Sequence, residues 1–400
     1  MSAPVISYKN AIPSKRVPNS LSTILCAKRP PLRETGRGIS RFIMFINSLR
    51  IYISMVNVLV NGVGVIGKRV AHAVHIQKDM KLFGIADAFP TSALRTNTQK
   101  GAPLYGVNVY ASNADFVKNF SEGTYPIQGT LEDALKTGKV DVVVDCTPKG
   151  VDAKNKPLYE RYGVKVIFQG GANANIAHTS FNAFANYNEA KTKQFVRVVS
   201  CNTTSIIRTL YTLSKKADIK EVHVSLVRRG TDPWDAREGP MNAIVPVPYI
   251  PSHHGPDVNT VLKNIKITTM AVKVPTTLAH VHMVHAKIKT PLSREQLVTA
   301  FMATPRVAVL KAAHGFDSTA SVHERYRDLL RPRYDMPEVV IWDETISVQG
   351  KDVHWMHMVH SESIVIPENI DAIRAMTGLE SSAKKSVEKT DASFKYTAFG

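Results

Sequence analysis

The stretch VNVLVNGVGVIGKRVAHAVHIQ, residues 56–77, decides the fold of the first half of this chain. An apolar run is followed by Gly62, Gly64 and Gly67 at the spacing G-x-G-x-x-G, and then by a helical pattern. The first glycine allows a tight turn, the second lets the backbone approach a pyrophosphate, and the third permits close packing of helix on strand. The free N–H groups at the helix start attract such an anion. A plain strand–turn–helix is the alternative that a glycine triplet leaves open.

The segments that follow extend this unit into a sheet. KLFGIAD (81–87) reads as a second strand that ends in Asp87, about twenty residues after the last glycine. A carboxylate there can accept a hydrogen bond from a ribose 2′-hydroxyl, and a strand-end turn role is the alternative. VDVVVDCTP (140–148) and VKVIFQGG (164–171) are apolar throughout, as strands covered on both faces are. The alternation of strands and helices predicts an α/β, Rossmann-type, doubly wound dinucleotide-binding domain.

A cysteine marks the change to the second half. In RVVSCNTTSIIRTL (197–210), Cys201 lies between a strand-like run and a helix for which Asn202 or Thr203 is the expected N-cap. A helix N-terminus stabilises a thiolate, so this position favours a reactive cysteine. Burial as an inert apolar residue is the alternative, because free cysteines are among the most buried residues.

The strands of the second half carry arginine and histidine. EVHVSLVRRG (221–230) alternates with period two and ends in Arg228 and Arg229, which suit a phosphate or a carboxylate unless they are merely solvated strand-end residues. AHVHMVHAKIK (279–289) alternates in the same way, which predicts an α+β catalytic domain with a mostly antiparallel sheet. The period of two places His280 and His282 on one face of this strand and His285 on the other. Two further histidines, His253 and His254, lie in the loop PSHHGPDV (251–258).

The net charge of +18 is spread unevenly. Residues 1–54 carry nine Lys or Arg against only Glu34, which gives +8 and leaves +10 for the rest. This segment is poor in acidic residues, lacks a periodic pattern and superficially resembles a transit peptide. We therefore expect a leader, disordered or not native, over 1–54. The dinucleotide-binding domain is expected over 55–200 and 360–400, and the catalytic domain over 201–359.

Composition excludes several classes of protein. Three cysteines cannot build a disulfide framework, and no paired CxxC spacing indicates a metal site, so a reducing cytoplasm fits best. The apolar stretch 42–60 is interrupted by polar residues, which argues against a membrane span. No RNP, zinc-finger or KH pattern accompanies the basic charge, so no nucleic acid is required. A moderately basic body suits an anionic substrate.

From Met55 onward the chain resembles the archaeal-type (type II) phosphorylating glyceraldehyde-3-phosphate dehydrogenases. The resemblance spans about 345 residues and rests on long motifs, among them NGVGVIGKRVA, DVVVDCTPKG, FQGGANA, RVVSCNTT, VRRGTDP, PSHHGPDV and TTLAHVH. It implies a homotetramer that converts glyceraldehyde 3-phosphate, phosphate and NAD or NADP to 1,3-bisphosphoglycerate through a cysteine thioester. It also implies that a C-terminal helix returns to the nucleotide domain.

The resemblance further implies a role for each matching residue. Cys201 matches the nucleophile and His280 the proposed base. Substrate contacts are implied or expected at Ser200, Asn202, Arg228, His253 and His254. Cofactor contacts are implied or expected at Gly62, Gly64, Val65, Ile66, Gly67, Asp87, Gly171, Arg229 and Ser361.

Two positions depart from the family pattern. The family commonly has a lysine where Asp87 stands and a glutamine where Ser361 stands, and both positions border the cofactor. A carboxylate repels the 2′-phosphate of NADP, so NAD is the favoured cofactor. The rival hypotheses are another cysteine-dependent semialdehyde or acyl-phosphate reductase of the same two-domain plan, and a basic, non-catalytic nucleotide- or RNA-binding protein.

Overall fold

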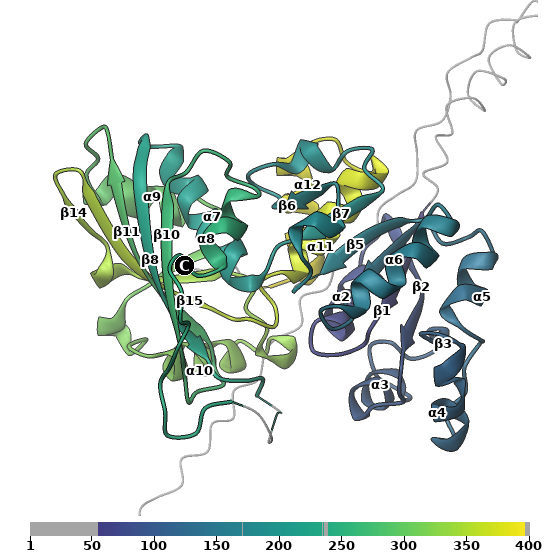
Figure 1. The fold of residues 1–400 in the computed structure, drawn as a ribbon. Helices are drawn as coiled ribbons and strands as arrows, with labels where there is room; N and C mark the ends of the chain where they lie inside the picture. The colour runs from purple at the N-terminus through teal and green to yellow at the C-terminus, as the bar shows by residue number, and fades with distance from the viewer. Residues whose placement is uncertain (1–54, 170, 234, 236–238, 397–400) are drawn as a thin grey trace, which may run out of the picture. The chain divides into compact units, whose positions relative to one another are not determined.

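The first half of the chain forms a parallel sheet whose strands alternate with helices (Figure 1). The computed structural model describes residues 55–169, 171–233, 235 and 239–396, so the leader prediction for 1–54 lies outside the described residues. The strand order is β3-β2-β1-β4-β5-β7-β6, and every pair is parallel. The strands are β1 (Val56–Asn61), β2 (Met80–Asp87), β3 (Val109–Ala111), β4 (Val142–Asp145), β5 (Lys165–Gln169), β6 (Thr179–Phe181) and β7 (Phe195–Val198).

Helices cover both faces of this sheet, which explains its apolar strands. Val58 and Val60 of β1 belong to one hydrophobic cluster and Leu59 between them to another, because successive strand side chains point to opposite faces. All three are fully buried. The helices of this half are α2 (Gly67–His75), α3 (Ser92–Thr98), α4 (Val117–Glu122), α5 (Leu131–Lys136) and α6 (Val151–Arg161). The doubly wound prediction is confirmed.

The second half forms a mixed, mostly antiparallel sheet in the order β12-β13-β15-β11-β8-β10-β9, with β14 paired to β15. Only β8 with β10 and β12 with β13 run parallel among the described pairs. The strands are β8 (Ile219–Arg229), β9 (Val245–Pro246), β10 (Ile267–Val274), β11 (His280–Ile288), β12 (Val307–Leu310), β13 (Val339–Trp342), β14 (Ser347–Gln349) and β15 (Asp352–Val359). The helices are α7 (Cys201–Ser214), α8 (His254–Asn259), α9 (Arg294–Met302) and α10 (Thr319–Asp328). The α+β prediction is confirmed.

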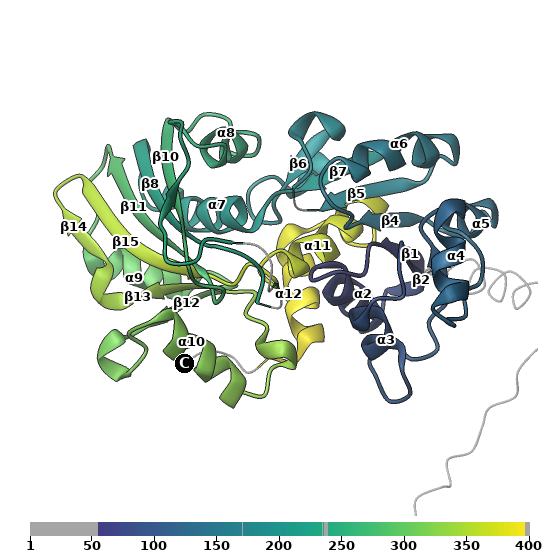
Figure 2. The same cartoon turned by 60° about the horizontal axis from the view of Figure 1, so that its bottom comes forward.

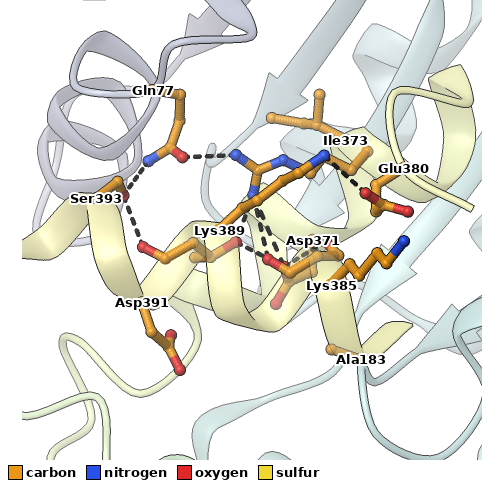
Figure 3. Close-up of polar contacts among 12 residues, drawn as sticks. Gln77, Ala183, Asp371, Ile373, Glu380, Lys385, Lys389, Asp391 and Ser393 are labelled. Carbon is orange, nitrogen blue, oxygen red and sulfur yellow. Dashed lines mark hydrogen bonds and ion pairs between the residues drawn. The ribbon is translucent and has the colours of Figure 1, made fainter. Parts of the chain in front are cut away.

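The last two helices, α11 (Ile366–Thr377) and α12 (Ala383–Phe394), pack beside the first elements of the chain (Figure 2). Helix α11 contacts α2, β5 and β7 as well as α12. Its Arg374 contacts the segment that follows α2: it donates to Gln77 Oε1 at 2.7 Å and to Asp79 Oδ2 at 2.7 Å. Gln77 in turn donates to Ser393 of α12 (Figure 3). The C-terminal helices therefore pack against the parallel sheet and its helix α2.

A buried ion-pair network, hereafter the α11 network, joins α11 to the second half of the chain. Arg208 of α7 lies 2.9 Å from Glu368, and Arg306 lies 2.7 Å from Asp371. Both arginines and both carboxylates are buried. Glu368 also accepts the backbone N–H of Ala183 at 2.7 Å. The network therefore contributes to the position of α7, whose first residue is Cys201. No described helix has the length and apolar character that a bilayer span requires.

Candidate active site

Cys201 is the first residue of α7, a helix of fourteen residues. Ser200 is the N-cap: it has extended backbone angles and accepts the N–H of Thr203 at 3.3 Å. The expectation that Asn202 or Thr203 caps the helix is wrong, because the N-cap oxygen must reach an N–H two or three residues onward and Ser200 does so. With Ser200 as the N-cap, Cys201 lies within the first turn of the helix, where the helix dipole favours negative charge. This supports the prediction that Cys201 is reactive.

Opposing effects act on the Cys201 sulfur. Burial raises its pKa, and a hydrogen bond with Ser361 and the charges of Arg229 and Arg228 lower it. The net direction is upward from the ordinary value. Burial therefore outweighs the groups that favour the thiolate, and any further hydrogen bond or positive charge at the sulfur would lower this pKa.

Three separate segments meet at this sulfur. Ser361, just after β15, places its Oγ 3.2 Å from Cys201 Sγ and 2.7 Å from His280 Nε2. The other ring nitrogen of His280, Nδ1, accepts the backbone N–H of Arg229 at 3.0 Å. Burial, followed by the charges of Arg229 and Arg228, holds the pKa of His280 well below its ordinary range. His280 is therefore neutral, and its one proton lies on Nε2, facing Ser361.

A second hydrogen-bonded chain orients Asn202. The indole Nε1–H of Trp355 donates to His357 Nδ1 at 3.2 Å, and His357 Nε2 lies 3.0 Å from His282 Nδ1. His282 Nε2 lies 2.9 Å from Asn202 Oδ1, and Asn202 Nδ2 lies 3.4 Å from His254 Nε2. Because an indole N–H only donates, each later link has one possible direction when the histidines are neutral. The Asn202 oxygen thus accepts from His282, and its nitrogen faces His254.

The neutral state of these histidines has a physical cause. Burial lowers the pKa of His357 to about 3 and the pKa of His282 well below its ordinary range. Burial, His253 and Arg228 lower the pKa of His254 to about 3. The strand period correctly placed His280 and His282 on the buried face of β11. His285 lies on the other face, where it contacts Asp352 at 2.7 Å.

Arg228 supplies positive charge beside these groups. Its Nε is buried and has no hydrogen-bond partner among the residues that the structure describes. Its charge lowers the pKa values of Cys201, His253 and His254, so it lies near all three. His253 is exposed, and its ring centroid lies 3.9 Å from that of His254. Lys149 also lowers the pKa of His253, and sequence reasoning did not single it out, because a lysine in a loop carries no spacing signal.

The glycine turn has the geometry that its spacing predicts. Gly62 has a φ of 90°, and a Cβ there would lie 3.0 Å from the Cys146 backbone. A Cβ at Gly67 would lie 1.7 Å from the Gly62 carbonyl oxygen, so only glycine lets α2 approach β1 this closely. Around Gly64, by contrast, no atom lies within 4 Å of a Cβ position. The middle of the turn is therefore open to a ligand, as a dinucleotide pyrophosphate requires.

Asp87 is bonded to the same turn. One carboxylate oxygen accepts the N–H of Val63 at 2.7 Å, and the other accepts the N–H of Ala88 at 2.7 Å. These bonds match the turn role that the sequence left open. The oxygen that accepts Ala88 N–H also accepts the N–H of Phe89 at 3.3 Å, so the oxygen bonded to Val63 is the one that keeps a second lone pair for a ribose hydroxyl.

A pocket of about 710 Å³ borders the turn, lined in part by Gly64, Val65, Lys68 and Arg333. The two cations were not predicted, since Arg333 comes from the distant segment before β13. Ile66 is the half-buried N-cap of α2.

The remaining cofactor candidates lie elsewhere. The guanidinium of Arg229 pairs with Glu362 and Asp232. Gly171 follows β5 and is exposed, with Lys149 Cβ 3.6 Å from its Cβ position. Cys146 lies under the glycine turn, and burial raises its pKa well above the ordinary value, as an inert thiol requires. Within the described ranges no cluster of His, Cys, Asp and Glu has the geometry of a metal site.

Comparisons with known proteins agree with this arrangement. The family model described as glyceraldehyde 3-phosphate dehydrogenase, C-terminal domain, matches residues 200–329. A protein named glyceraldehyde-3-phosphate dehydrogenase from Hyperthermus butylicus is 47% identical over 337 residues, which are 84% of this chain and 96% of that protein. One of the same name from Pyrococcus abyssi is 48% identical over 338 residues, 84% of this chain and 98% of its own. A third, from Methanopyrus kandleri, is 46% identical over 341 residues, 84% and 96% of the two chains.

Proposed function

The chain belongs to the glyceraldehyde-3-phosphate dehydrogenase family, and on that premise we propose that it oxidises glyceraldehyde 3-phosphate, with inorganic phosphate and a nicotinamide dinucleotide, to 1,3-bisphosphoglycerate. The observation that carries the proposal is the position of Cys201. It is the first residue of α7, and its sulfur contacts Ser361, which in turn contacts His280. The sulfur therefore lies at a helix N-terminus with hydrogen-bonding groups beside it, where a thiolate is favoured.

In the proposed reaction the Cys201 thiolate attacks the aldehyde carbon, and the carbonyl oxygen becomes an alkoxide. Loss of hydride from that carbon converts the adduct to a thioester. When bound, the nicotinamide supplies the hydride acceptor. Phosphate then attacks the thioester carbon, the C–S bond breaks, and the acyl phosphate leaves with the thiolate regenerated. A thioester retains the free energy of the oxidation, which is why cysteine suits this chemistry better than serine.

We assign His280 the role of hydrogen-bond donor to the developing alkoxide. The family resemblance implies a proton acceptor at this position. In this chain the lone pair of Nδ1 is occupied by the Arg229 N–H, so neutral His280 offers only Nε2–H, which faces Ser361 Oγ and would turn to the alkoxide once the adduct forms. A donor aimed at the charge that forms in the transition state is worth about 10²–10³ in rate.

The substrate phosphates are assigned to the positive charge beside Cys201. Arg228 supports this because its Nε is buried without a partner in the described part of the chain, and a phosphate oxygen would satisfy it. His253 and His254 flank the same region. Ser200 and Asn202 adjoin Cys201, and the amide of Asn202 is oriented by His282.

The cofactor is assigned to the glycine turn, with the pyrophosphate on Gly64, Val65 and Ile66 at the start of α2. The open space at Gly64 and the pocket beside it fit this group. NAD is the favoured form, because the Asp87 carboxylate is bonded to the turn and repels a 2′-phosphate. Lys68 and Arg333 line the same pocket, and their positive charges would attract the 2′-phosphate of NADP. Gly171, Arg229 and Ser361 remain further candidates from the resemblance.

Exchange of the Asp87 charge tests this preference. Asp87→Lys is expected to shift the ratio of kcat/KM for NADP over NAD upward by about 5- to 150-fold, since such a charge pair is worth about 1–3 kcal/mol. Asp87→Asn should shift it in the same direction by less, while keeping an acceptor for the Val63 N–H. Asp115→Lys, the same charge change at an exposed site, serves as the control. A wild type that prefers NADP would contradict the assignment.

The small number of cysteines supports a cytoplasmic setting for the protein.

A homotetramer is the assembly that the resemblance supports. Three exposed methionines, Met270, Met283 and Met356, lie in one cross-strand row on the outer face of the catalytic sheet. Exposed apolar rows of this kind suit a subunit contact. Light scattering should give four chains for the wild type and fewer for Met283→Glu, and a monomeric wild type would exclude the tetramer.

The deciding experiment is a steady-state assay with glyceraldehyde 3-phosphate, phosphate, and each of NAD and NADP. Phosphate-dependent formation of reduced cofactor is expected. A panel of amino-acid semialdehydes separates this function from that of the related reductases, and a preference for one of them would overturn the proposal.

A further inference from the structure

Ser361 stands between the two groups to which catalysis is assigned. It is 7% exposed, and its Oγ contacts both Cys201 Sγ and His280 Nε2. The antiparallel pairing of β11 with β15 sets His280 opposite Val359, two residues before Ser361. The serine therefore reaches the sulfur from the strand next to the histidine.

The hydrogen bonds on either side of Ser361 leave its hydroxyl hydrogen available to the sulfur. A backbone N–H only donates, so Arg229 N–H requires a lone pair on His280 Nδ1. Neutral His280 then donates Nε2–H to Ser361 Oγ. The serine accepts from the histidine, so its own hydrogen can point to Cys201 Sγ, and once the thiol has ionised this is the only direction that the contact allows. A sulfur that accepts a hydrogen bond is stabilised as the thiolate more than as the thiol.

We propose that Ser361 is a positioning residue that holds Cys201 Sγ as a hydrogen-bond acceptor, with its own direction set by His280 and the Arg229 backbone. The proposal rests on the assignment of Cys201 as nucleophile. It gives Ser361 a role in thiol ionisation besides the cofactor contact that the resemblance implies. The glutamine that is common at this position in the family is longer than serine and carries an amide in place of the hydroxyl.

Other groups near the sulfur act in known directions. Arg228 and Arg229 at the end of β8 favour the thiolate, as does the N-terminus of α7. Glu362, which follows Ser361, is paired with Arg229. His280 is neutral over the range of interest. Removal of the Ser361 hydroxyl therefore changes one favourable contact and leaves the charges in place.

The test is the pH profile of Cys201 alkylation by iodoacetamide, followed by mass spectrometry of the Cys201 peptide in a Cys26→Ser, Cys146→Ser background. Ser361→Ala is expected to raise the midpoint by about one to two pH units, because a hydrogen bond to a charged group is worth about that much. Below the midpoint, alkylation should slow by about 10- to 100-fold. Ser361→Thr keeps the hydroxyl and should keep the wild-type midpoint, and Ser361→Val is its isosteric partner without one.

Ser363→Ala is the matched control. Ser363 is also a buried serine of this segment, but its hydroxyl contacts His360 and the Met336 N–H instead of the sulfur. It should lower the melting temperature without moving the midpoint. An unchanged midpoint in Ser361→Ala, or equal midpoints for the Thr and Val variants, would overturn the proposal. Alkylation needs no substrate, so a shifted midpoint in a protein that fails the dehydrogenase assay would show that the hydrogen bond exists and the proposed function is wrong.

Discussion

Two buried polar regions of this chain treat charge in opposite ways. In the α11 network, each arginine faces a carboxylate: Arg208 lies 2.9 Å from Glu368, and Arg306 lies 2.7 Å from Asp371. Around Cys201, His282 and His357 are neutral and hydrogen-bonded to each other, and Arg228 forms no ion pair with a carboxylate among the described residues. One region neutralises its charges internally, and the other keeps a cation beside a thiol.

The difference separates what stabilises the fold from what is available to a ligand. A buried ion pair that loses one partner costs about 3–5 kcal/mol, so the α11 network resists change. A cation such as Arg228 that lacks a carboxylate partner does not stabilise the fold through an ion pair. It is available to a bound anion, which is typical of a binding site. The two regions share helix α7, which begins at Cys201 and carries Arg208. Variants in the two regions should therefore separate activity from stability.

The largest expected effect is on activity alone. Cys201→Ser should abolish phosphate-dependent oxidation while leaving the melting temperature and cofactor binding nearly unchanged, because a hydroxyl occupies the same place but is a far weaker nucleophile. Steady-state assays, thermal melts and cofactor titration measure the three quantities. Cys146→Ser should be catalytically silent. Turnover above a few per cent in Cys201→Ser would rule out the covalent mechanism.

His280 should also affect rate rather than stability. His280→Asn is expected to slow hydride transfer in single-turnover experiments by about 10²–10³-fold, the usual worth of a lost oxyanion donor. His280→Gln should lose less, because its longer amide can donate from near the position of Nε2. Equal losses in the two variants would favour a proton-accepting role, and a larger loss in His282→Asn would move the assignment to His282.

The α11 network should respond in the opposite sense. Glu368→Gln leaves Arg208 and Arg306 short of a carboxylate and should lower the free energy of unfolding by about 3–5 kcal/mol. The fraction that remains folded should keep its kcat. Urea denaturation and active-site titration by Cys201 alkylation distinguish the two quantities. A stable Glu368→Gln variant with reduced kcat would remove the distinction between the regions.

The smallest effect is a pH dependence that arises in the region around Cys201. The pKa of His357 falls from 6.5 in the unfolded chain to about 3 in the fold, so its contribution is complete above pH 6.5 and is lost as the pH falls toward 3. Each such histidine should weaken the fold by about 1.4 kcal/mol for every pH unit below 6.5. His357→Gln should reduce this slope between pH 6.5 and pH 5 in urea titrations. An unchanged slope would mean that His357 is not neutral through burial.

Much of the fold could be predicted from short stretches of the sequence. Gly62 and Gly67 are required by contacts within one strand–turn–helix unit, so their spacing alone predicted the turn. The period of two in β11 separated His280 and His282 from His285 without knowledge of the partner strands. The position of Cys201 near a helix start was also predicted, but its cap was not, because Ser200, Asn202 and Thr203 are all competent capping residues and only backbone geometry chooses among them.

Sequence alone determined the two domain types, the glycine turn, the place of Cys201 at a helix start and the histidine-bearing strands, because each depends on local periodicity or on a motif with its own mechanism. Tertiary structure alone decided which groups meet. Ser361 contacts residues 160 and 81 positions away, and Arg333 reaches the pocket beside Gly64 from the far half of the chain. The directions of the hydrogen bonds through His280 and Asn202 follow from an amide and an indole on other strands. No spacing in a sequence encodes such contacts, because they arise only when distant segments pack.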